Sequence, residues 1–448
     1  MSKLTVAKFG GTSVADHEAM LRCAQIIKND PSNRLVAVSA SSGVTNLLVR
    51  LSQQDVPAQE QLEIISQIKD IQLNITQHLA NQAELNVLVD DLLAELANLA
   101  AHQAEHHNLK TADSILSYGE QFSSNIFAEV LRSIGVNAEQ FDVRQVMKTN
   151  SLYGAAAVDL EQVQSHTDEI LKPLLAEKVI VTQGFIGQDG LGNTTTLGRG
   201  GSDYSAAILA EALHADNLAI WTDVSGIYTT DPRITAQARA IPEISFDEAA
   251  EMATFGAKIL HPATLIPAMR KNIPVFVGSS KEPEKGGTRI QQAVDSNPTY
   301  RSIALRREQT LVTVKSPAML HASGFLAKVF AILAKHELSV DLITTSEISV
   351  ALTFDNPTGS TQSLITGVVV KELEELCEVT VERGLSLVAV IGNDMHLTKG
   401  IGRTIFDNLT NFNVRMICHG ASENNLCFLV DENDANPVVE KLHDCLFS

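Results

Sequence analysis

The chain has 448 residues, 44% of them hydrophobic, and its 34 basic and 53 acidic residues give a formal net charge of −19. This length suits two or three domains with hydrophobic cores, and this composition is typical of a globular protein in water. The negative charge argues against nucleic acid and membrane surfaces as partners, so loops and a few placed cations must capture any anionic ligand.

The first predicted strand ends at a lysine and a pair of glycines. "LTVAKFGG" begins at Leu4, and the helical stretch "ADHEAMLRCAQIIKN" begins at Ala15. Lys8 stands at the end of the strand beside the backbone N–H groups of Gly10 and Gly11, where it could stabilise a transferring phosphoryl group. The alternative is a solvated lysine beside an ordinary turn.

Further apolar runs alternate with helical stretches over roughly the first 290 residues. These runs are "RLVAVSAS", "VIVTQGFIG", "LAIWTDVSG" and "IPVFVGSS". The rhythm predicts an α/β domain with a largely parallel sheet, whose loops at the carboxyl ends of the strands meet in one crevice. The polar stretch between Glu60 and Lys110 interrupts this rhythm and predicts a helical hairpin that covers one side of the site.

The stretch "LGRGGSDYSAA", Leu197 to Ala207, has the composition of a phosphate-binding loop. Its glycines and the helix that follows would leave several N–H groups pointing at one spot, which suits an anion. The pattern G-x-x-x-x-G-K-[ST] is absent, so this is not a P-loop by motif. We expect Lys8, brought to this loop by the sheet, to supply the missing positive charge.

Two charged side chains indicate the kind of substrate. Arg199, inside the glycine loop, can offer a planar fork of donors to a carboxylate. Glu120, in "SYGEQFSS", lies among small and aromatic residues, where an isolated carboxylate needs a cationic partner. Together they suit a zwitterion such as an amino acid; the alternative is that both belong to structural ion pairs.

Other patterns point to no zinc site, disulfide or export signal. "HQAEH", His102 to His106, matches the H-x-x-E-H form of a zinc protease, but such matches arise easily in a polar, histidine-rich helix. The five cysteines are odd in number and include no C-x-x-C pair, which favours a reducing compartment. "MSKLTVAKFGG" lacks the apolar core of a signal peptide, so we expect a cytoplasmic protein.

The last third of the chain contains an internal repeat. A shift of 76 residues aligns the stretch that begins at Gly324 with the one that begins at Gly400, without gaps. The shift also pairs Phe330 with Phe406, Leu333 with Leu409, and Ser346-Glu347 with Ser422-Glu423. Each copy predicts a helix, a strand, a turn and a strand. The alternative to a regulatory role is that the two α+β modules only hold the protein together.

The motifs "KFGGTSVAD", "SASSGVTNLL", "SYGEQFSS", "TTTLGRGGSDYSAAILAEAL", "WTDVSGIYTTDPR" and "EMATFGAKILHPATL" follow one another along the chain. Their order resembles that of the aspartate kinases of the amino acid kinase superfamily, and the match covers essentially the whole chain. The tail, with "GFLAKVF", "SVDLITTSE" and their repeat, resembles the tandem ACT domains that regulate those kinases. Without a fused homoserine dehydrogenase, the chain is most similar to the single-function, lysine-sensitive members.

The resemblance implies an α/β fold, with an amino acid kinase-like sheet sandwiched by helices and followed by two α+β (ferredoxin-like) ACT domains. The catalytic domain would span 1–293 and the regulatory region 294–448. The first ACT domain would cover about 309–384 and the second about 385–448, with an interleaved contribution from 300–315 left open. A homodimer through the ACT domains is implied, and its pairing into a tetramer is left open.

The resemblance also implies the reaction. ATP would phosphorylate the β-carboxylate of L-aspartate to 4-phospho-L-aspartate, with Mg²⁺, in the first step of the pathway to lysine, threonine and methionine. L-Lysine would inhibit the enzyme by feedback. The alternatives are a kinase of another small acidic amino acid in the superfamily and a non-catalytic amino-acid sensor.

Site residues follow from the same resemblance. Lys8 would bridge the transferring phosphoryl group and Asp203 would organise either Lys8 or the metal, for which no protein ligand is assigned. The phosphates and the nucleotide would be bound by Lys8, Gly10, Gly11, Ser39, Gly201, Ser202, Thr222, Asp223, Tyr228, Arg233 and Lys258. L-Aspartate would be bound by Thr45, Glu120, Arg199, Gly200, Gly201 and Ser202, with Glu120 on the ammonium and Arg199 on a carboxylate.

The lysine effector would bind at an interface between ACT domains of two chains. Its contacts would be Met319, Phe325, Leu326, Ser339, Val340, Asp341, Thr345, Ser346 and Glu347. Ala322 lacks a hydroxyl that a related enzyme carries in this turn. The second copy has Arg415, Ile417 and His419 in place of the acidic cluster, so we expect it to bind no lysine and to serve as dimer surface.

Overall fold

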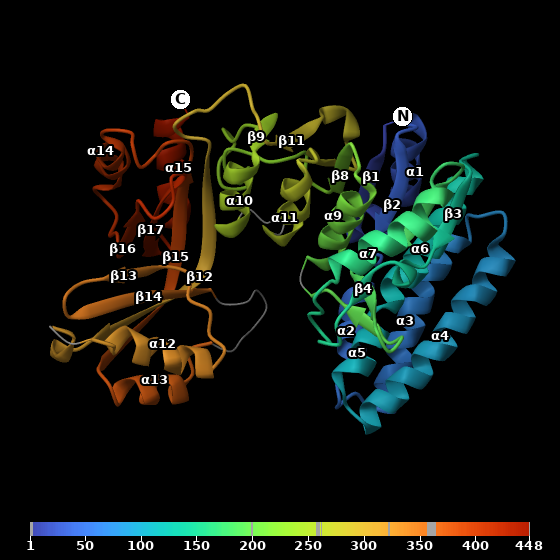
Figure 1. Ribbon diagram of the computed structural model, residues 1–448, viewed down its shortest axis with the longest axis horizontal. Coiled ribbons are helices and arrows are strands. Elements are labelled where there is room, and N and C mark those ends of the chain that lie inside the picture. Colours follow the sequence, from blue (N-terminus) through green and yellow to red (C-terminus); the bar gives the residue numbers. More distant parts are fainter. Residues whose placement is uncertain are drawn as a thin grey trace. The chain divides into compact units, whose positions relative to one another are not determined.

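The computed structural model describes residues 3–198, 200–256, 260, 262–320, 323–355 and 364–447. The chain divides into two compact units. Figure 1 shows it coloured from blue at the N-terminus to red at the C-terminus. The first unit consists of Met1–Ile227, Ala240–Phe246 and Ile259–Val294, and the second of Tyr228–Arg239, Asp247–Lys258 and Asp295–Ser448. The two domain ranges expected from the sequence stay predictions.

The first unit is built on an eight-stranded sheet with the order β3-β5-β2-β1-β8-β10-β11-β9. The strands are β1 (Thr5–Phe9), β2 (Asn33–Val38), β3 (Ala138–Phe141), β5 (Val179–Gln183), β8 (Asn217–Thr222), β9 (Glu243–Ser245), β10 (Val275–Ser279) and β11 (Gly287–Gln291). All neighbours run parallel except β10 and β11. Every residue of β1 and β5 is buried, as expected of parallel strands covered on both faces.

Helices cover both faces of this sheet. On one face, Phe9 contacts Phe127 of α6 (Tyr118–Ser133), which packs beside α1 (His17–Asn29). The neighbouring residue Lys8 points to the other face, because side chains alternate along a strand. There it meets Asp203 of α9 (Gly201–Leu213), which packs in turn on α11 (Pro262–Lys271). The helices α7 (Leu160–His166) and α8 (Lys172–Leu174) precede α9 in the chain. The helix α10 (Phe246–Thr254) belongs to the second unit from Asp247 onward.

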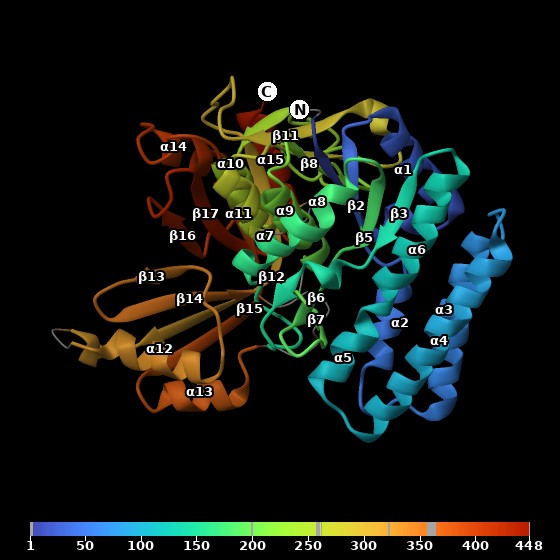
Figure 2. The same cartoon turned by 45° about the vertical axis from the view of Figure 1, so that its right-hand side comes forward.

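The stretch predicted as a helical hairpin forms α3 (Ala58–Thr76) and α4 (Gln82–Glu105), which run side by side in Figure 2. Their apolar faces join the core that α1 and α6 form with the sheet. The short helices α2 (Val44–Leu51) and α5 (Leu109–Leu116) flank the hairpin. The first unit also contains a three-stranded sheet that the sequence did not predict. Its strands are β4 (Lys148–Thr149), β6 (Ile186–Asp189) and β7 (Thr194–Thr196).

The second unit carries a six-stranded antiparallel sheet with the order β13-β14-β12-β15-β17-β16. The strands are β12 (Ser302–Lys315), β13 (Ile343–Thr345), β14 (Ser349–Asp355), β15 (Glu378–Ile391), β16 (Met416–His419) and β17 (Asn425–Asp431). The helices are α12 (Phe325–Lys335), α13 (Gly367–Glu374), α14 (Ile401–Phe406) and α15 (Ala435–Leu446). The predicted succession of helix, strand, turn and strand occurs in both copies.

The repeat extends further than the sequence comparison indicates. β12, which precedes the predicted first copy, aligns with β15 at the same shift of 76 residues. Equivalent side chains are buried in both cores: Val312 and Val388, Val314 and Val390, Val329 and Ile405, Leu333 and Leu409, Val350 and Leu426, Leu352 and Phe428, and Phe354 and Val430. The two modules therefore share one packing scheme as well as one order of elements.

The two long strands β12 and β15 join the modules. They pair antiparallel along their length, so that 311–315 pairs with 378–382 in the first module and 302–306 with 387–391 in the second. At the equivalent positions Glu308 and Gly384 the backbone takes φ values of 58° and 72°. A register shift beside Glu308 marks a bulge at the point where each strand passes from one module to the other. No helix in the described ranges combines the length and the apolar character needed to cross a bilayer.

Candidate active site

The carboxyl ends of five parallel strands gather at one edge of the first unit's sheet. β1, β2, β5, β8 and β10 end there and lead into Gly10, Ser39, Gly184, Asp223 and Ser280. This is the edge at which open parallel sheets bind ligands. The loops predicted to hold phosphate and substrate therefore have a common location in the fold.

Lys8 and Asp203 meet on the α9 side of the sheet. The Lys8 Nζ lies 2.6 Å from the Asp203 Oδ1, with about one tenth of the lysine side chain exposed. A Cβ added at Gly10 would lie 3.6 Å from that Nζ, so the glycine leaves the cation uncovered. Because Asp203 is in the first turn of α9, the pair holds the ammonium beside the N-terminus of that helix.

The loop after β2 packs tightly against the turn after β1. A Cβ at Gly11 would come within 2.8 Å of the Ala40 carbonyl oxygen, so only glycine fits there. The Ser39 N–H donates to the Phe9 carbonyl at 3.1 Å. Gly43 then begins α2 with φ of 88°, and Thr45 lies exposed in the first turn of that helix. Backbone contacts thus hold the turn after β1 against the loop after β2, and that loop leads directly to Thr45.

Glu120 is the most strongly perturbed acid of this site. It is 5% exposed, and its Oε1 accepts a hydrogen bond from the Ala40 N–H at 3.0 Å. Burial raises the pKa of Glu120 to about 8, and the Ala40 N–H and the charge of Lys8 oppose that rise. No salt bridge to Glu120 occurs among the described residues. The carboxyl group therefore lacks the cation that would stabilise its ionised form.

The glycine-rich loop is shaped by close backbone approaches. Gly198 and Gly200 both have φ of 74°, and Gly200 precedes the first turn of α9. A Cβ at Gly184 would lie 2.7 Å from the Ser202 Cβ, which fixes the end of β5 against that turn. Arg199 and Lys258, predicted to bind substrate and phosphate, lie outside the described residues.

Sequence reasoning missed Phe185 at the end of β5. Its φ of 69° is rare for a residue with a large side chain, and its ring would lie 2.7 Å from a Cβ at Gly201. Its N–H donates to the Ser205 hydroxyl at 3.0 Å. Strain of this kind tends to collect at functional sites. The flanking glycines in "QGFIG" were the only signal in the sequence.

The predicted nucleotide residues fall in both units. Thr222 ends β8, where its carbonyl accepts from the Ser280 N–H at 2.8 Å, and Asp223 beside it is exposed. Tyr228 and Arg233 belong to the second unit, where Arg233 forms a salt bridge of 2.6 Å with Asp231. The described residues contain no group of three or more His, Cys, Asp or Glu side chains placed to hold a metal ion.

The predicted lysine-binding residues run from Met319, ahead of α12, to Glu347 in the β13–β14 turn of the first ACT module. Asp341 forms a salt bridge of 2.8 Å with Arg306, whereas Glu347 is exposed in the turn. The Ser346 N–H donates to the Ser349 carbonyl at 2.8 Å. Met319, Phe325 and Val340 pack on the module's core, and Leu326, Ser339 and Thr345 are exposed. Ala322 lies outside the described residues.

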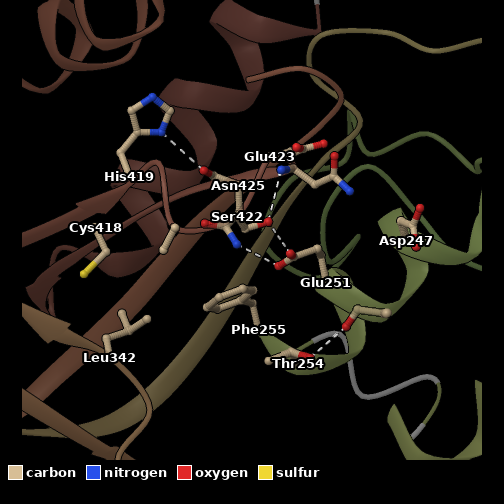
Figure 3. Close-up of a pocket in the computed structure, with 13 residues that line it drawn as sticks. Asp247, Glu251, Thr254, Phe255, Leu342, Cys418, His419, Ser422, Glu423 and Asn425 are labelled. Carbon is tan, nitrogen blue, oxygen red and sulfur yellow. Dashed lines mark hydrogen bonds between the residues drawn. The ribbon is translucent and has the colours of Figure 1, made fainter. Parts of the chain in front are cut away.

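The equivalent turn of the second module borders a cavity of about 560 Å³, shown in Figure 3. Glu251 of α10 reaches that turn, where its carboxylate accepts hydrogen bonds from the Ser422 hydroxyl and, at 2.7 Å, from the Asn425 side chain. Ser422 corresponds to Ser346 in the repeat. In the second copy, the hydroxyl of Ser422 and the side-chain amide of Asn425 therefore already donate to a carboxylate of the same chain, that of Glu251.

Comparison with known proteins defines the class. Residues 3–279 match the model of the amino acid kinase family, and residues 388–446 match an ACT-domain model. The first match covers more than half of the chain, so the chain belongs to the amino acid kinase family. The fold class predicted from the sequence is confirmed.

Within that family the chain belongs with the aspartokinases. It is 53% identical to the lysine-sensitive aspartokinase 3 of Escherichia coli (strain K12) over 100% of both chains. The crystal structure of E. coli aspartokinase III with aspartate and ADP is 52% identical, covers 100% of both chains and has a TM-score of 0.91. The structure of that enzyme with lysine and aspartate has a TM-score of 0.86 at 52% identity, covering 99% of this chain and 100% of that one. The predicted resemblance is confirmed.

Proposed function

We propose that this protein is an ATP-dependent kinase that phosphorylates the β-carboxylate of L-aspartate, giving 4-phospho-L-aspartate and ADP. This reaction is the first step of the pathway from aspartate to lysine, threonine and methionine. One observation carries the proposal: the buried carboxyl group of Glu120 lies in the field of Lys8 at the carboxyl edge of the sheet, in a chain of the aspartokinase family.

The chemistry requires little from the protein beyond placement and charge. A β-carboxylate is already ionised at neutral pH, so no general base is needed to make it a nucleophile. Lys8 neutralises the charge that develops on the transferring phosphoryl group, and Asp203 holds the Lys8 ammonium in place. Glu120 binds the ammonium of aspartate, Arg199 binds a carboxylate, and Thr45, Gly200, Gly201 and Ser202 complete the pocket.

The second substrate is MgATP. The turn at Gly10 and Gly11, together with Ser39, Gly201, Ser202 and Lys258, contacts the phosphates. Thr222, Asp223, Tyr228 and Arg233 hold the rest of the nucleotide. Mg²⁺ is a hard cation that prefers phosphate and water oxygens, so it enters the site on the nucleotide.

L-Lysine inhibits the enzyme by binding to the first ACT module. Glu347 offers an exposed carboxylate, and Asp341 can exchange its partner Arg306 for an ammonium of the effector. Support comes from the E. coli relative, which is described as lysine-sensitive and has been crystallised with lysine. The enzyme acts in the cytoplasm as a homodimer joined through its ACT modules.

The second ACT module does not bind lysine. This module has Arg415, Ile417 and His419 at the positions of Ser339, Asp341 and Ile343, so of the two acids only Glu347 has an acidic counterpart, Glu423. Arg415 pairs with Glu382. The Glu251 carboxylate also takes up the Ser422 and Asn425 donors of that turn. We therefore assign to this module a structural role beside α10.

Trapping the acyl phosphate with hydroxylamine tests the proposal. ATP and Mg²⁺ should give a hydroxamate with L-aspartate, and much less with L-glutamate, because the extra methylene shifts the reacting carboxylate from its position. L-Lysine should suppress the product and L-threonine should not. Product with glutamate alone would favour a kinase for another acidic amino acid, and no product with any amino acid would favour a non-catalytic sensor.

A further inference from the structure

A buried carboxylate on α5 connects two loops of the first unit. Asp113 is 1% exposed, and no salt bridge to it occurs in the described part of the chain. Its Oδ2 accepts from the Thr196 N–H at 2.9 Å, and its Oδ1 accepts from the Thr196 hydroxyl at 2.8 Å. The Gly154 N–H lies 3.0 Å from both oxygens. Donors from two separate segments thus replace the water that this carboxylate loses on folding.

Both segments border the glycine-rich loop. Thr196 is the last residue of β7, and Gly198, with φ of 74°, follows it by two positions. The segment that contains Gly154 lies against that turn: the Ala156 N–H donates to the Thr196 carbonyl at 2.8 Å, and a Cβ at Gly198 would lie 3.5 Å from the Gly154 carbonyl oxygen. Asp113 therefore fixes the backbone that enters the turn toward Gly200 and Gly201, together with the segment that packs against this turn.

The helix that carries Asp113 also leads into the other half of the substrate site. α5 ends at Leu116, and after Ser117 the chain continues as α6, whose first turn contains Glu120. The Ser117 N–H donates to the Asp113 carbonyl at 3.1 Å, so no flexible loop separates the two acids. The side chain of Asp113 holds the glycine-rich loop, and its backbone continues into the helix of Glu120.

We propose that Asp113 is a positioning residue for the amino-acid substrate, which sets the spacing between Glu120 and the glycine-rich loop. This inference rests on the proposed function, in which those two elements hold opposite ends of one aspartate molecule. An amino acid bound at both ends is sensitive to that spacing, since small misplacements of binding groups reduce both affinity and rate. The nucleotide loops after β8 and β10 make no hydrogen bond to Asp113 among the described residues.

Asp189 is a matched control in the same small sheet. It is 3% exposed and accepts hydrogen bonds from the N–H groups of Leu191 and Asn193 and from the hydroxyls of Ser151 and Tyr153. The Leu191 and Asn193 bonds close the β6–β7 turn, at the end of the hairpin away from Thr196, and the Ser151 and Tyr153 bonds attach that turn to the segment before Gly154. Replacing Asp189 removes a buried carboxylate with at least as many partners, while the hydrogen bonds from Thr196 and Gly154 to Asp113 stay in place.

The experiment compares Asp113→Asn, Asp189→Asn and the unmodified enzyme. Asp113→Asn places an NH₂ group opposite N–H donors, and we expect the KM for L-aspartate to rise about tenfold or more while the KM for MgATP stays within about twofold. Asp189→Asn should reduce thermal stability and leave both KM values within about twofold. Thr196→Val, which keeps the N–H and loses the hydroxyl donor, should shift the aspartate KM in the same direction by about threefold if Asp113→Asn fails to fold.

The positioning role would be overturned if Asp113→Asn changed the KM for L-aspartate and the KM for MgATP equally. It would also be overturned if Asp189→Asn raised the aspartate KM as much as Asp113→Asn does. An unchanged aspartate KM in both Asp113→Asn and Thr196→Val would overturn it as well. Calorimetric titration of the unmodified enzyme with L-aspartate distinguishes failure of the proposed function from failure of the role of Asp113. An unmodified enzyme that neither binds nor phosphorylates aspartate contradicts the proposed function itself, whereas an active one with unaffected variants contradicts only the role of Asp113.

Discussion

At the scale of single residues, Glu120 links the electrostatics of the site to its substrate. The pKa of its carboxyl group is raised from 4.5 to about 8 by burial, so the free enzyme holds it largely protonated at pH 7. Between an unfolded-state pKa of 4.5 and the folded-state pKa of about 8, the folded protein keeps a proton on Glu120 that the unfolded chain has lost. The free energy of unfolding therefore falls as pH rises through this range. The ammonium of aspartate favours the ionised form, so substrate binding should release a proton.

This predicts a specific pH dependence of substrate binding. Between about pH 6.5 and pH 8 the affinity for L-aspartate should increase roughly tenfold, because less of the carboxyl group must lose its proton. Calorimetry in two buffers of different ionisation enthalpy measures both the affinity and the proton release. Glu120→Gln should bind weakly without this pH dependence. Binding by the unmodified enzyme that is independent of pH and releases no proton would show that Glu120 does not meet the ammonium.

Neither Asp113 nor Phe185 could be recognised as a site residue from the sequence. An aspartate in a polar helical stretch reads as a solvent-exposed residue, and only the fold shows that Thr196 and Gly154 surround it. The positive φ of Phe185 has no pattern in the sequence apart from its neighbouring glycines. Lys8 and Glu120 could be singled out because a lysine at a strand end and an acid among apolar residues are unusual combinations.

At the scale of elements, the contact between the end of β5 and the first turn of α9 determines where Asp203 lies. Gly184 approaches Ser202 so closely that an added Cβ would lie 2.9 Å from the Ser202 Cα. A backbone atom cannot rotate away as the end of a side chain can. We therefore expect Gly184→Ala to push the start of α9, and Asp203 with it, away from Lys8.

The expected effect of Gly184→Ala is a fall in kcat of about a hundredfold, since a displacement of about 1 Å in a catalytic group has an effect of this size. The loss of stability should be only about 1–3 kcal/mol, as for other overpacked sites. Gly190→Ala is the control, because a Cβ there meets no atom within 4 Å. Steady-state kinetics and thermal unfolding measure both effects. Equal activity in the two variants would contradict this account of the contact.

The major elements could be predicted because their signals are strong. Apolar runs that end in glycine-rich loops predicted β1, β2, β5, β8 and β10, and the ungapped repeat predicted both ACT modules. The strands β4, β7 and β9 have two or three residues each, and so carry too little periodicity to identify. The pairing of β12 with β15 could not be predicted either, because it depends on contacts between the two copies.

At the scale of the whole molecule, the chain joins a phosphoryl-transfer site to a duplicated ACT region. The two modules have equivalent cores, and each exposes a glutamate at its turn, Glu347 or Glu423. They differ in that the second also binds the Glu251 carboxylate through Ser422 and Asn425. Duplication with later divergence of the turns accounts for both features. An effector that binds the first turn can change activity only if it binds one state of the enzyme better than another.

The most direct test of a lysine-regulated aspartate kinase is NMR of the product formed from aspartate labelled with ¹³C at either carboxyl carbon. With MgATP, the β-carboxyl ¹³C signal should shift and become coupled to ³¹P, while the α-carboxyl carbon shows no coupling to phosphorus. L-Lysine should reduce the rate at which this signal appears, and L-threonine should leave it unchanged. Phosphorus on the α-carboxyl group, or no acyl phosphate from an enzyme that is folded and binds ATP, would contradict the account.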